Sequence, residues 1–488
     1  MAERVFRPYD AQQPVPGPAD LRAWLPADHA IYLLSDLLDA LDLGPITAVY
    51  QQGDGGGNPP YHPELLTKLL FYAYSEGVVS SRQIAAKTYT DLAFRVLTTD
   101  QHPDFRTISD FRERHLSALS DLFVQVVRLA GRLGLVKLEQ VAQDGSKILA
   151  NGSKHRAMSY ARMQQAETRL SREIQALLEA ARVADAAEDA QDGAERTGAE
   201  GPLELGGEVA RRAQRLATIR AAKAALEAEA QAEAEAIRVA DAAERERRAA
   251  AGEPKKPGRP PTPSDLPQPT AQRNFTDPDS RIMKNADKAF VQAYNGQLAV
   301  DASAHQLIVG CLVTNQAADA PHLVPMLGQL AATLGRAPDA YSADCGYFSA
   351  DNVAAVADAG VTAYIPPDRR RHPDAAVPLP VAQVLAAVGL DPPDVGPGEV
   401  PREETAAKAT MRARLQTPAG RAAYALRKQT VEPVFGQFKA GRGLRQFLLR
   451  GLAKVTGEWT LWCLTHNLRK LSQALRAEPA LRAQQVPS

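Results

Sequence analysis

The sequence has few cysteines, no long apolar run and no net charge, and each absence narrows what the protein can be. Its three cysteines, Cys311, Cys345 and Cys463, are too few and too far apart for a disulfide framework or a zinc-binding pattern, which favours a reducing environment inside the cell. Nowhere do about 18 apolar residues follow one another, and the first residues carry charges and prolines where a signal peptide has an apolar run. We therefore expect a cytoplasmic protein without a membrane partner.

Basic and acidic residues cancel, at 57 each, so the chain as a whole has no field that would attract nucleic acid. Any DNA contact must therefore come from local basic patches. With 488 residues, of which 45% are hydrophobic, the chain is long enough for two or more domains and apolar enough for a sizeable core.

Helical patterns dominate the region before residue 133. Residues 61–77 carry a wide apolar stripe, and capping-box spacings indicate two further helix starts, at Ser80 and Thr107. Short helices joined by tight turns are typical of a helix-turn-helix unit that binds DNA, and equally of plain helix packing. The predicted DNA contacts of this region are Arg106 and Arg112.

The composition changes abruptly between residues 157 and 270. Residues 157–251 are rich in Ala, Glu and Arg, with apolar residues three and four apart, and residues 192–208 interrupt the pattern. This predicts a helical hairpin or short coiled coil, of the kind that serves as a spacer or a protein contact. A proline-rich basic linker follows at 252–270. Its KKPGRPP run resembles the AT-hook of minor-groove binders but lacks the second core arginine, so a plain basic linker is the favoured interpretation.

Strand patterns occur on both sides of this insertion. The first lies within residues 135–150. After the linker, a hairpin is predicted at residues 294–296 (YNG), and a β-branched run occupies 306–315. A helix, a strand ending at Asp344, a second helix and a last strand follow. This order predicts a mixed sheet flanked by helices, an α/β fold that the insertion interrupts after its first strand.

Three acidic residues stand out by their positions. Asp144 and Asp344 each follow an apolar run shortly before a glycine, and such aspartates are commonly turn residues that accept local backbone hydrogen bonds. Glu432 lies in residues 402–454, which hold twelve Lys or Arg against three Glu, and an acid there is commonly a salt-bridge partner. The competing interpretation is a site shared by an early strand, a later strand and a late helix.

Several short motifs follow one another around these acids, and their order and combination are specific. They are DGSKILAN from Asp144, NFTDPDSRIMK, AYNGQLAVD, ADCGYFS around Asp344, VEPVFGQFK around Glu432, and finally RGLAKVTGEWTLWCLTHNLRKL. In their combination they resemble the DDE transposases of bacterial insertion sequences, closest to the IS1182-like group of the IS4-type superfamily. The resemblance covers most of residues 55–472.

The resemblance implies an RNase H-like sheet that carries Asp144, Asp344 and Glu432 as the catalytic triad. It implies an enzyme that binds the terminal repeats of its element, cleaves the DNA ends and transfers the 3′-OH strands to target DNA. It also implies a nucleoid-associated bacterial protein that is a homodimer or larger when bound to DNA.

Phosphodiester chemistry of this kind uses two Mg²⁺ ions about 3.5–4 Å apart, with Mn²⁺ as an alternative. Three acids without histidine or cysteine suit Mg²⁺, which prefers hard oxygen ligands. We expect Asp144 to bridge both ions, and Asp344 and Glu432 each to complete the coordination of one ion.

The superfamily signature of Tyr, Arg, Glu and Lys is met only in part, because four residues instead of three separate Arg427 from Glu432. Lys428 is therefore an alternative to Arg427 in the signature. The predicted DNA contacts of this region are Tyr424, Arg427, Lys428, Lys439, Arg442, Arg445 and Arg450.

Two other functions fit parts of the sequence. A catalytically inactive DNA-bridging or regulatory protein would use the helical N-terminal unit, the coiled coil and the basic C-terminal region, but the presence of all three acids favours the enzyme. A stand-alone RNase H-type nuclease needs neither the helical front module nor the long insertion.

These patterns divide the chain into seven segments. They are an N-terminal arm (1–55), a helical DNA-binding-like domain (56–133), the first part of the catalytic domain (134–156), the helical insertion (157–251), the basic linker (252–270), the second part of the catalytic domain (271–472) and a C-terminal tail (473–488).

Overall fold

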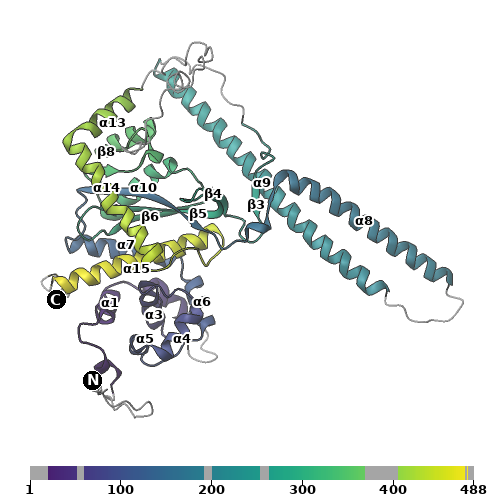
Figure 1. Cartoon of the computed structure of the whole chain (residues 1–488), viewed down its shortest axis with the longest axis horizontal. Helices are drawn as coiled ribbons and strands as arrows, with labels where there is room; N and C mark the ends of the chain where they lie inside the picture. The colour runs from purple at the N-terminus through teal and green to yellow at the C-terminus, as the bar shows by residue number, and fades with distance from the viewer. Residues whose placement is uncertain are drawn as a thin grey trace, which may run out of the picture.

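The chain folds into a helical N-terminal domain, a mixed sheet with helices on both faces, and a pair of long helices that project away from the sheet (Figure 1). The computed structural model describes residues 20–51, 60–191, 201–252, 263–368, 405–478 and 481. Within these ranges, no helix combines the length and the apolar character that a membrane crossing requires.

Short helices build the N-terminal domain, as the sequence predicts. Their apolar faces share one core with α15 (Leu452–Ala477), and Leu37 of α1 is fully buried in it. The helix α6 begins earlier than the predicted Thr107, because Asp104 caps it by accepting a hydrogen bond from Arg106 N at 2.8 Å. The elements are η1 (Leu21–Trp24), α1 (Ala30–Asp39), α2 (Gly44–Gln51), α3 (Pro63–Ser75), α4 (Ser81–Thr90), α5 (Leu92–Leu97), α6 (Phe105–Arg114) and α7 (Ala118–Arg132).

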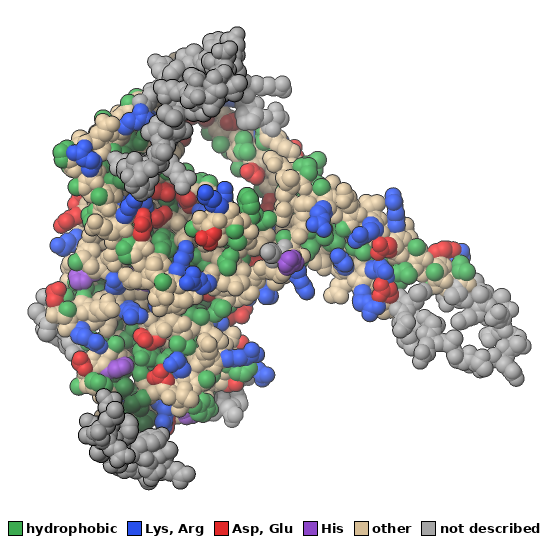
Figure 2. All heavy atoms as spheres, viewed as in Figure 1, with side chains coloured by type: hydrophobic (Ala, Val, Ile, Leu, Met, Phe, Trp, Pro, Cys, Tyr) green, Lys and Arg blue, Asp and Glu red, His purple; other side chains and the backbone are tan. Residues whose placement is uncertain are grey.

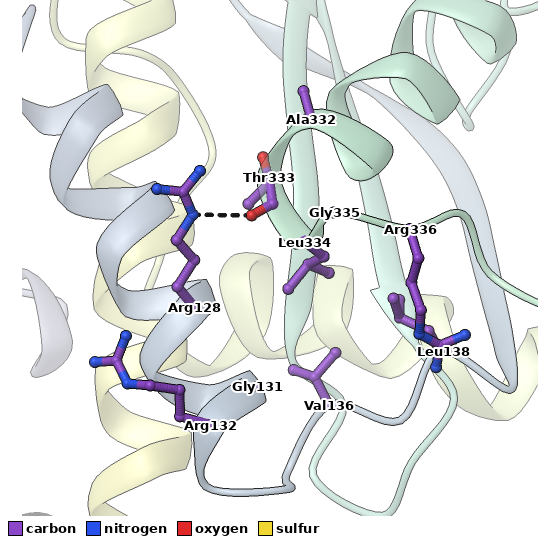
Figure 3. Close-up of a pocket in the computed structure, with 10 residues that line it drawn as sticks. All are labelled: Arg128, Gly131, Arg132, Val136, Leu138, Ala332, Thr333, Leu334, Gly335 and Arg336. Atoms are coloured by element: carbon purple, nitrogen blue, oxygen red, sulfur yellow. Dashed lines mark hydrogen bonds between the residues drawn. The ribbon is translucent and has the colours of Figure 1, made fainter.

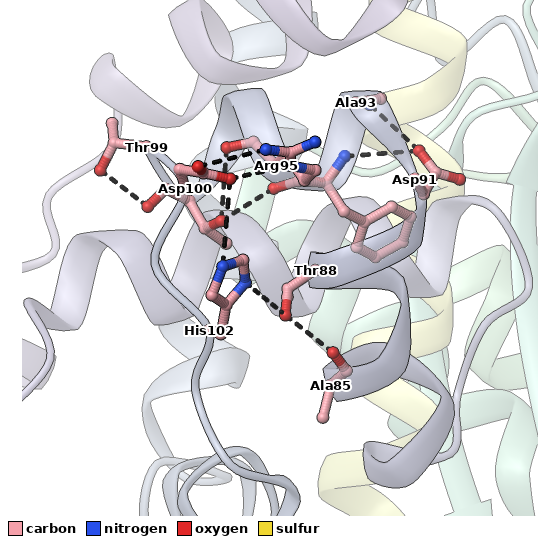
Figure 4. A network of polar contacts seen from close by, with 10 residues as sticks. Ala85, Thr88, Asp91, Ala93, Arg95, Thr99, Asp100 and His102 are labelled. Atoms are coloured by element: carbon pink, nitrogen blue, oxygen red, sulfur yellow. Dashed lines mark hydrogen bonds and ion pairs between the residues drawn. The ribbon is translucent and has the colours of Figure 1, made fainter. Parts of the chain in front are cut away.

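A polar network holds the turn between α5 and α6 (Figure 4). Arg95 Nε donates a hydrogen bond to Asp100 Oδ1 at 2.8 Å, and His102 Nδ1 lies 3.4 Å from Thr88 Oγ1 on α4. Thr99 and Asp100 both have positive φ, a backbone conformation that residues other than glycine seldom adopt. The side-chain contacts therefore stabilise the turn and tie it to α4 and α5.

Six strands form one mixed sheet, in which β5 lies between β1 and the pair β4 and β6, and β7 and β8 follow on the other side of β1. β5 is antiparallel to its three neighbours, whereas β1, β7 and β8 are parallel. The predicted mixed α/β sheet is confirmed. The strands are β1 (Gln140–Leu149), β4 (Arg281–Lys284), β5 (Phe290–Asp301), β6 (Ile308–Thr314), β7 (Ala340–Ser342) and β8 (Thr362–Tyr364).

The predicted hairpin at residues 294–296 is wrong, because these residues lie within one continuous strand, β5. Asn295 is paired with Lys147 of β1 and with Thr314 of β6. Gly296 lies so close to Trp459 that an added Cβ would be 3.0 Å from the indole ring. The asparagine and glycine that resemble a turn signal therefore serve packing inside the sheet.

Helices cover both faces of the sheet. Side chains alternate along a strand, so Gly296 and Ala299 of β5 face opposite sides. Trp459 of α15 packs at Gly296, and Met326 packs on the other face at Gly310, the cross-strand partner of Ala299. The elements after β6, besides α15, are η3 (Ala320–His322), α10 (Leu323–Leu334), η4 (Cys345–Tyr347), α11 (Ala350–Asp358), α13 (Ala406–Gln416), α14 (Pro418–Gly436) and the π-helical turn η5 (Gln437–Gly441).

The insertion forms two helices that pack along each other, α8 (Tyr160–Gln191) and α9 (Gly201–Ala250), as the apolar spacing predicts. They have a small core of their own, which includes Met163 and Ile219. Basic and acidic side chains are interspersed along this projecting pair (Figure 2). The two ends of the insertion meet where β2 (Ala157–Ser159) pairs with β3 (Gln272–Asn274).

Two boundaries differ from the sequence prediction. The helix α9 already begins at Gly201, so the break predicted over 192–208 ends earlier than expected. The helix α15 continues to Ala477, past the predicted end of the catalytic domain at residue 472. The KKPGRPP run lies outside the described residues.

Candidate active site

Asp144 lies in the middle of β1, between β5 and the parallel strands. Leu298 is its cross-strand partner on β5, and its carboxylate accepts a hydrogen bond from Gly145 N at 2.8 Å. Its side chain points to the face of the sheet that α14 covers, where it meets Arg427. A central strand thus presents one half-buried carboxylate to a helix from the far end of the chain.

Asp344 follows β7, the parallel neighbour of β1. Ser342 of β7 is in register with Ala142, so Asp344, two residues further on, lies beside Asp144. The Asp344 carboxylate accepts a hydrogen bond from Gly346 N at 2.8 Å and caps η4. The turn role suggested for each aspartate is therefore confirmed for Asp344 and wrong for Asp144, which lies inside β1; the parallel pairing of β1 and β7 brings the two carboxylates to the same place.

Arg427 joins Asp144 to the third predicted acid, Glu432. Arg427 Nη1 donates to Asp144 Oδ2 at 3.1 Å, and Nη2 donates to Glu432 Oε1 at 3.4 Å. The Arg427 side chain is 7% exposed and that of Glu432 is 51% exposed. The guanidinium carbon lies 5.6 Å from the centre of the Tyr424 ring, whereas Lys428 is exposed. Arg427, and not Lys428, is therefore the signature cation that reaches the acids, despite the extra residue in the spacing.

The pKa of Asp144 depends on its burial and on its charged neighbours. Burial raises the pKa of Asp144 to about 6, with Arg427 opposing the rise and Asp344 adding to it. One unit of pKa corresponds to about 1.4 kcal/mol between the two protonation states, so near neutral pH the ionised form of Asp144 is only slightly favoured. A carboxylate perturbed by burial and by a like charge is typical of functional sites.

Lys439 of η5 reaches the same face of β1 as Asp144. It meets this face at Ser146, two residues further along the strand. Its Nζ donates a hydrogen bond to Ser146 Oγ at 2.5 Å. Burial lowers the pKa of Lys439 and Arg445 acts in the same direction, while Asp144 raises it. Lys439 therefore lies within electrostatic reach of both Asp144 and the exposed Arg445.

Two of the predicted DNA contacts are corrected, because their guanidinium groups are buried and point inward. Arg112 donates to Tyr74 Oη and to the carbonyl of Val79, both at 3.0 Å. Arg442 packs on the ring of Trp462 and donates to Thr465 Oγ1 at 3.0 Å. Both side chains hold helices together and have no free face for a phosphate. Arg427 is also buried, but its guanidinium faces the acids of the candidate site, and its contact with DNA stays a prediction.

Four predicted DNA contacts stay on the surface. Arg106 lies beside the Phe105 ring, which Arg82 also contacts. Arg450 Nε donates a hydrogen bond to the carbonyl of Asn151 at 2.8 Å. The exposed set is Arg106, Lys428, Arg445 and Arg450. These four residues, with the partly buried Lys439 and Tyr424, remain predicted DNA contacts.

The three acids fit Mg²⁺ by their donor chemistry, because they offer only carboxylate oxygens. A divalent cation would also relieve the repulsion that helps to raise the pKa of Asp144 beside Asp344. In this structure the Arg427 guanidinium lies between Asp144 and Glu432, and no three acidic, histidine or cysteine side chains of the described ranges gather closely enough to hold an ion. Metal ligation by the three acids therefore stays a prediction.

A fourth acid, Asp319, lies next to this site and has no counterpart in the sequence predictions. It precedes η3, and its carboxylate lies close to Gly145, next to Asp144 on β1, and to Gly346 of the turn that Asp344 caps. In the sequence it is one aspartate in the loop TNQAADAPH, and only the pairing of β1 with β5 brings it to the site.

A separate hollow of about 630 Å³ lies at the opposite edge of the sheet, where α7 and α10 end and β1 is about to begin (Figure 3). Arg128 Nε donates to the carbonyl of Thr333 at 2.9 Å, in the last turn of α10. A cation there stabilises the negative end of the helix dipole. Leu138, which lines this hollow, lies just before the start of β1, whereas Asp344 follows the end of β7. Because β1 and β7 are parallel, these positions are at opposite ends of the strands, and the hollow is not part of the candidate site.

Comparison with known protein families gives two matches. The family described as "Transposase domain (DUF772)" matches residues 19–114, and the family described as "Transposase DDE domain" matches residues 399–472. The first match covers most of the helical N-terminal domain, and the second includes Arg427, Glu432 and Lys439. No curated protein and no solved structure gives a match.

Proposed function

Because the chain is an insertion-sequence transposase of the DDE type, we propose that it binds the terminal repeats of its element, cleaves the DNA at these ends and transfers the 3′-OH strands to target DNA. One observation carries the proposal. Arg427 contacts Asp144 and Glu432 at once, while Asp144 stands beside Asp344, so residues 288 positions apart (432 − 144) belong to one acidic site.

The strand arrangement supports an RNase H-like catalytic domain. Three antiparallel strands, β6, β5 and β1, are followed by the parallel strands β7 and β8; Asp144 stands on β1, and Asp344 comes directly after the adjacent strand β7. The chain leaves this sheet after β1 for the insertion and returns through β3 to β4 and β5. The insertion can therefore be long without separating the acids.

Asp144, Asp344 and Glu432 are the residues that would hold Mg²⁺ or Mn²⁺. Two such ions supply an activated water or 3′-OH and positive charge at the leaving oxygen. Asp144 must give up its proton before it can bind a cation. Since its pKa is about 6, the site gains its full negative charge only above about pH 6.

Arg427 holds the acids in the absence of DNA. Its hydrogen bonds keep Asp144 on the α14 face and tie the exposed Glu432 to it, which offsets part of the repulsion among the carboxylates. Lys439 and Arg445 extend positive charge from this point along the surface, where they would bind DNA phosphates without reading sequence. We propose that the helical N-terminal domain supplies the recognition of the ends, and that a dimer brings two ends together.

A nicking assay tests the proposal. The full chain is incubated with DNA that carries the ends of its element, with Mg²⁺, with Mn²⁺ or with EDTA, and with end-free DNA as the control. We expect nicks at the element ends with either metal. Asp344→Asn should abolish them and leave binding to the ends within a few-fold, because the amide keeps the shape of the side chain but loses its charge. Metal-independent nicking, or a normal rate in Asp344→Asn, would overturn the assignment. End binding without any nicking by the unaltered chain would favour the inactive DNA-bridging protein.

A further inference from the structure

Asp319 occupies an unusual place for a loop aspartate. It stands at the cap position of η3, yet its side chain makes no capping bond and reaches instead across β1 and β5. The side chain is 24% exposed. It is held on the face of the sheet opposite to that of Asp144, because Gly145 and Lys147 alternate with Asp144 along β1.

Three donors converge on one oxygen of Asp319. Oδ1 accepts hydrogen bonds from Asn295 Nδ2 at 2.7 Å, Gln297 Nε2 at 2.8 Å and Lys147 Nζ at 3.0 Å. Charge-assisted hydrogen bonds of this kind are about twice as strong as neutral ones. The carboxylate is therefore fixed by β1 and β5 together, and Lys147 is paired with it on the face away from Asp144.

Asp319 lies directly behind the two glycines that orient the catalytic candidates. A Cβ added to Gly145 would be nearest to Gln297 Nε2, itself bonded to Asp319, and 2.8 Å from Asp319 Oδ1. One added to Gly346 would be 3.0 Å from Asp344 Oδ1 and 3.6 Å from Asp319 Oδ2. These are the glycines whose backbone N–H groups bond to the carboxylates of Asp144 and Asp344. The Asp319 carboxylate thus lies next to the space beside both glycines, Gly145 within β1 and Gly346 after β7.

We infer that Asp319 is a positioning residue of the active site, which sets the separation of the Asp144 and Asp344 carboxylates by holding Gly145 and Gly346 from behind. The inference rests on the proposed function, because only a site that binds cations between these carboxylates needs their separation fixed. Residues that orient metal ligands in this way typically change metal affinity or activity by about 10- to 100-fold when they are replaced.

The experiment measures Mn²⁺ binding to the full chain by electron paramagnetic resonance, together with Mn²⁺-dependent nicking over a range of Mn²⁺ concentrations. Asp319→Asn keeps an oxygen that the three donors can reach but removes the charge. We expect about tenfold weaker Mn²⁺ binding and slower nicking that recovers at high Mn²⁺. Asp358→Asn, an exposed aspartate at the end of α11, is the matched control and should change neither property.

Gly346→Ala is the second variant, and it tests the geometry should Asp319→Asn fail to fold. Its methyl group would enter between the Asp344 carboxylate, at 3.0 Å from Oδ1, and Asp319, in an exposed turn. We expect the same loss of Mn²⁺ affinity. Unaltered Mn²⁺ binding in a folded Asp319→Asn or in Gly346→Ala would overturn the inference while the proposed function stands. If the unaltered chain itself neither binds Mn²⁺ nor nicks DNA, the proposed function fails first.

Discussion

Replacing Arg427 by methionine keeps most of the side-chain volume and removes the charge that stabilises Asp144. If Asp144 had to stay ionised and unpaired, the loss would be about 3–5 kcal/mol, as for other broken buried ion pairs. Asp144 has a less costly alternative, because its pKa is already about 6. At pH 7 its ionised form is favoured by about 1.4 kcal/mol, which is the most that taking up a proton can cost.

We therefore expect Arg427→Met to lower the free energy of unfolding by about 2 kcal/mol at pH 7, from proton uptake by Asp144 and the lost contact with Tyr424. Without Arg427 the folded-state pKa of Asp144 rises further above its unfolded value. A carboxyl group with a raised folded pKa loses stability as pH rises. The difference from the unaltered chain should therefore grow between pH 6 and pH 8, by up to about 1.4 kcal/mol per unit, and shrink towards pH 5.5, where Asp144 takes up its proton in both proteins.

The assay is urea unfolding at pH 5.5, 7 and 8, followed by the fluorescence of the buried Trp459 and Trp462 against the sheet. Arg412→Met, which removes a surface ion pair with Asp368, is the control and should leave the urea midpoint unchanged at all three pH values. A loss above about 4 kcal/mol at pH 7, or a loss that does not depend on pH, would show that Asp144 does not exchange its charge for a proton.

Further predictions concern other parts of the chain. His466 is fully buried with its pKa lowered to about 3, so protonation of the unfolded chain should cost about 2 kcal/mol of stability between pH 6.5 and pH 5; His466→Gln should remove this loss in the same urea assay, and an unchanged pH slope would contradict it. Lys439→Ala should reduce the slope of log binding constant against log salt by about one unit, whereas an unchanged slope would remove Lys439 from the DNA contacts. Replacing residues 161–269 by a short linker should preserve a cooperative melt of the core, because β2 and β3 already meet at the base of the insertion; loss of that melt would show that the insertion belongs to the core.

The mixed sheet could be predicted from the sequence because its strands are apolar and β-branched, and the helices between them have clear periods. The hairpin at residues 294–296 could not be predicted correctly. Asn-Gly is a strong turn signal, but here Gly296 leaves room for Trp459, which lies 163 residues later (459 − 296), and Asn295 donates to Asp319. Both reasons exist only in the folded chain.

For basic residues, the sequence shows where charge lies along the chain, but not whether a side chain points to the surface or into the core. Arg442 lies among basic residues that include Arg445, yet it follows the π-helical turn η5 and points inward to Trp462 and Thr465. Arg112 is likewise bound inside the N-terminal domain. The three acids stand out in the sequence because their order along the chain carries the resemblance, whereas the place of Asp319 depends on the register of β1 against β5.

Iron-mediated cleavage of the protein backbone tests whether Asp144, Asp344 and Glu432 bind one shared metal site. Fe²⁺ is added in place of Mg²⁺, with ascorbate and hydrogen peroxide, so that radicals formed at the bound ion cut the chain nearby, and the fragments are identified by mass spectrometry. We predict cuts close to residues 144, 344 and 432 that excess Mg²⁺ suppresses and that Asp144→Asn abolishes. Cuts confined to one of these segments, or cuts that persist unchanged in Asp144→Asn, would contradict a shared metal site.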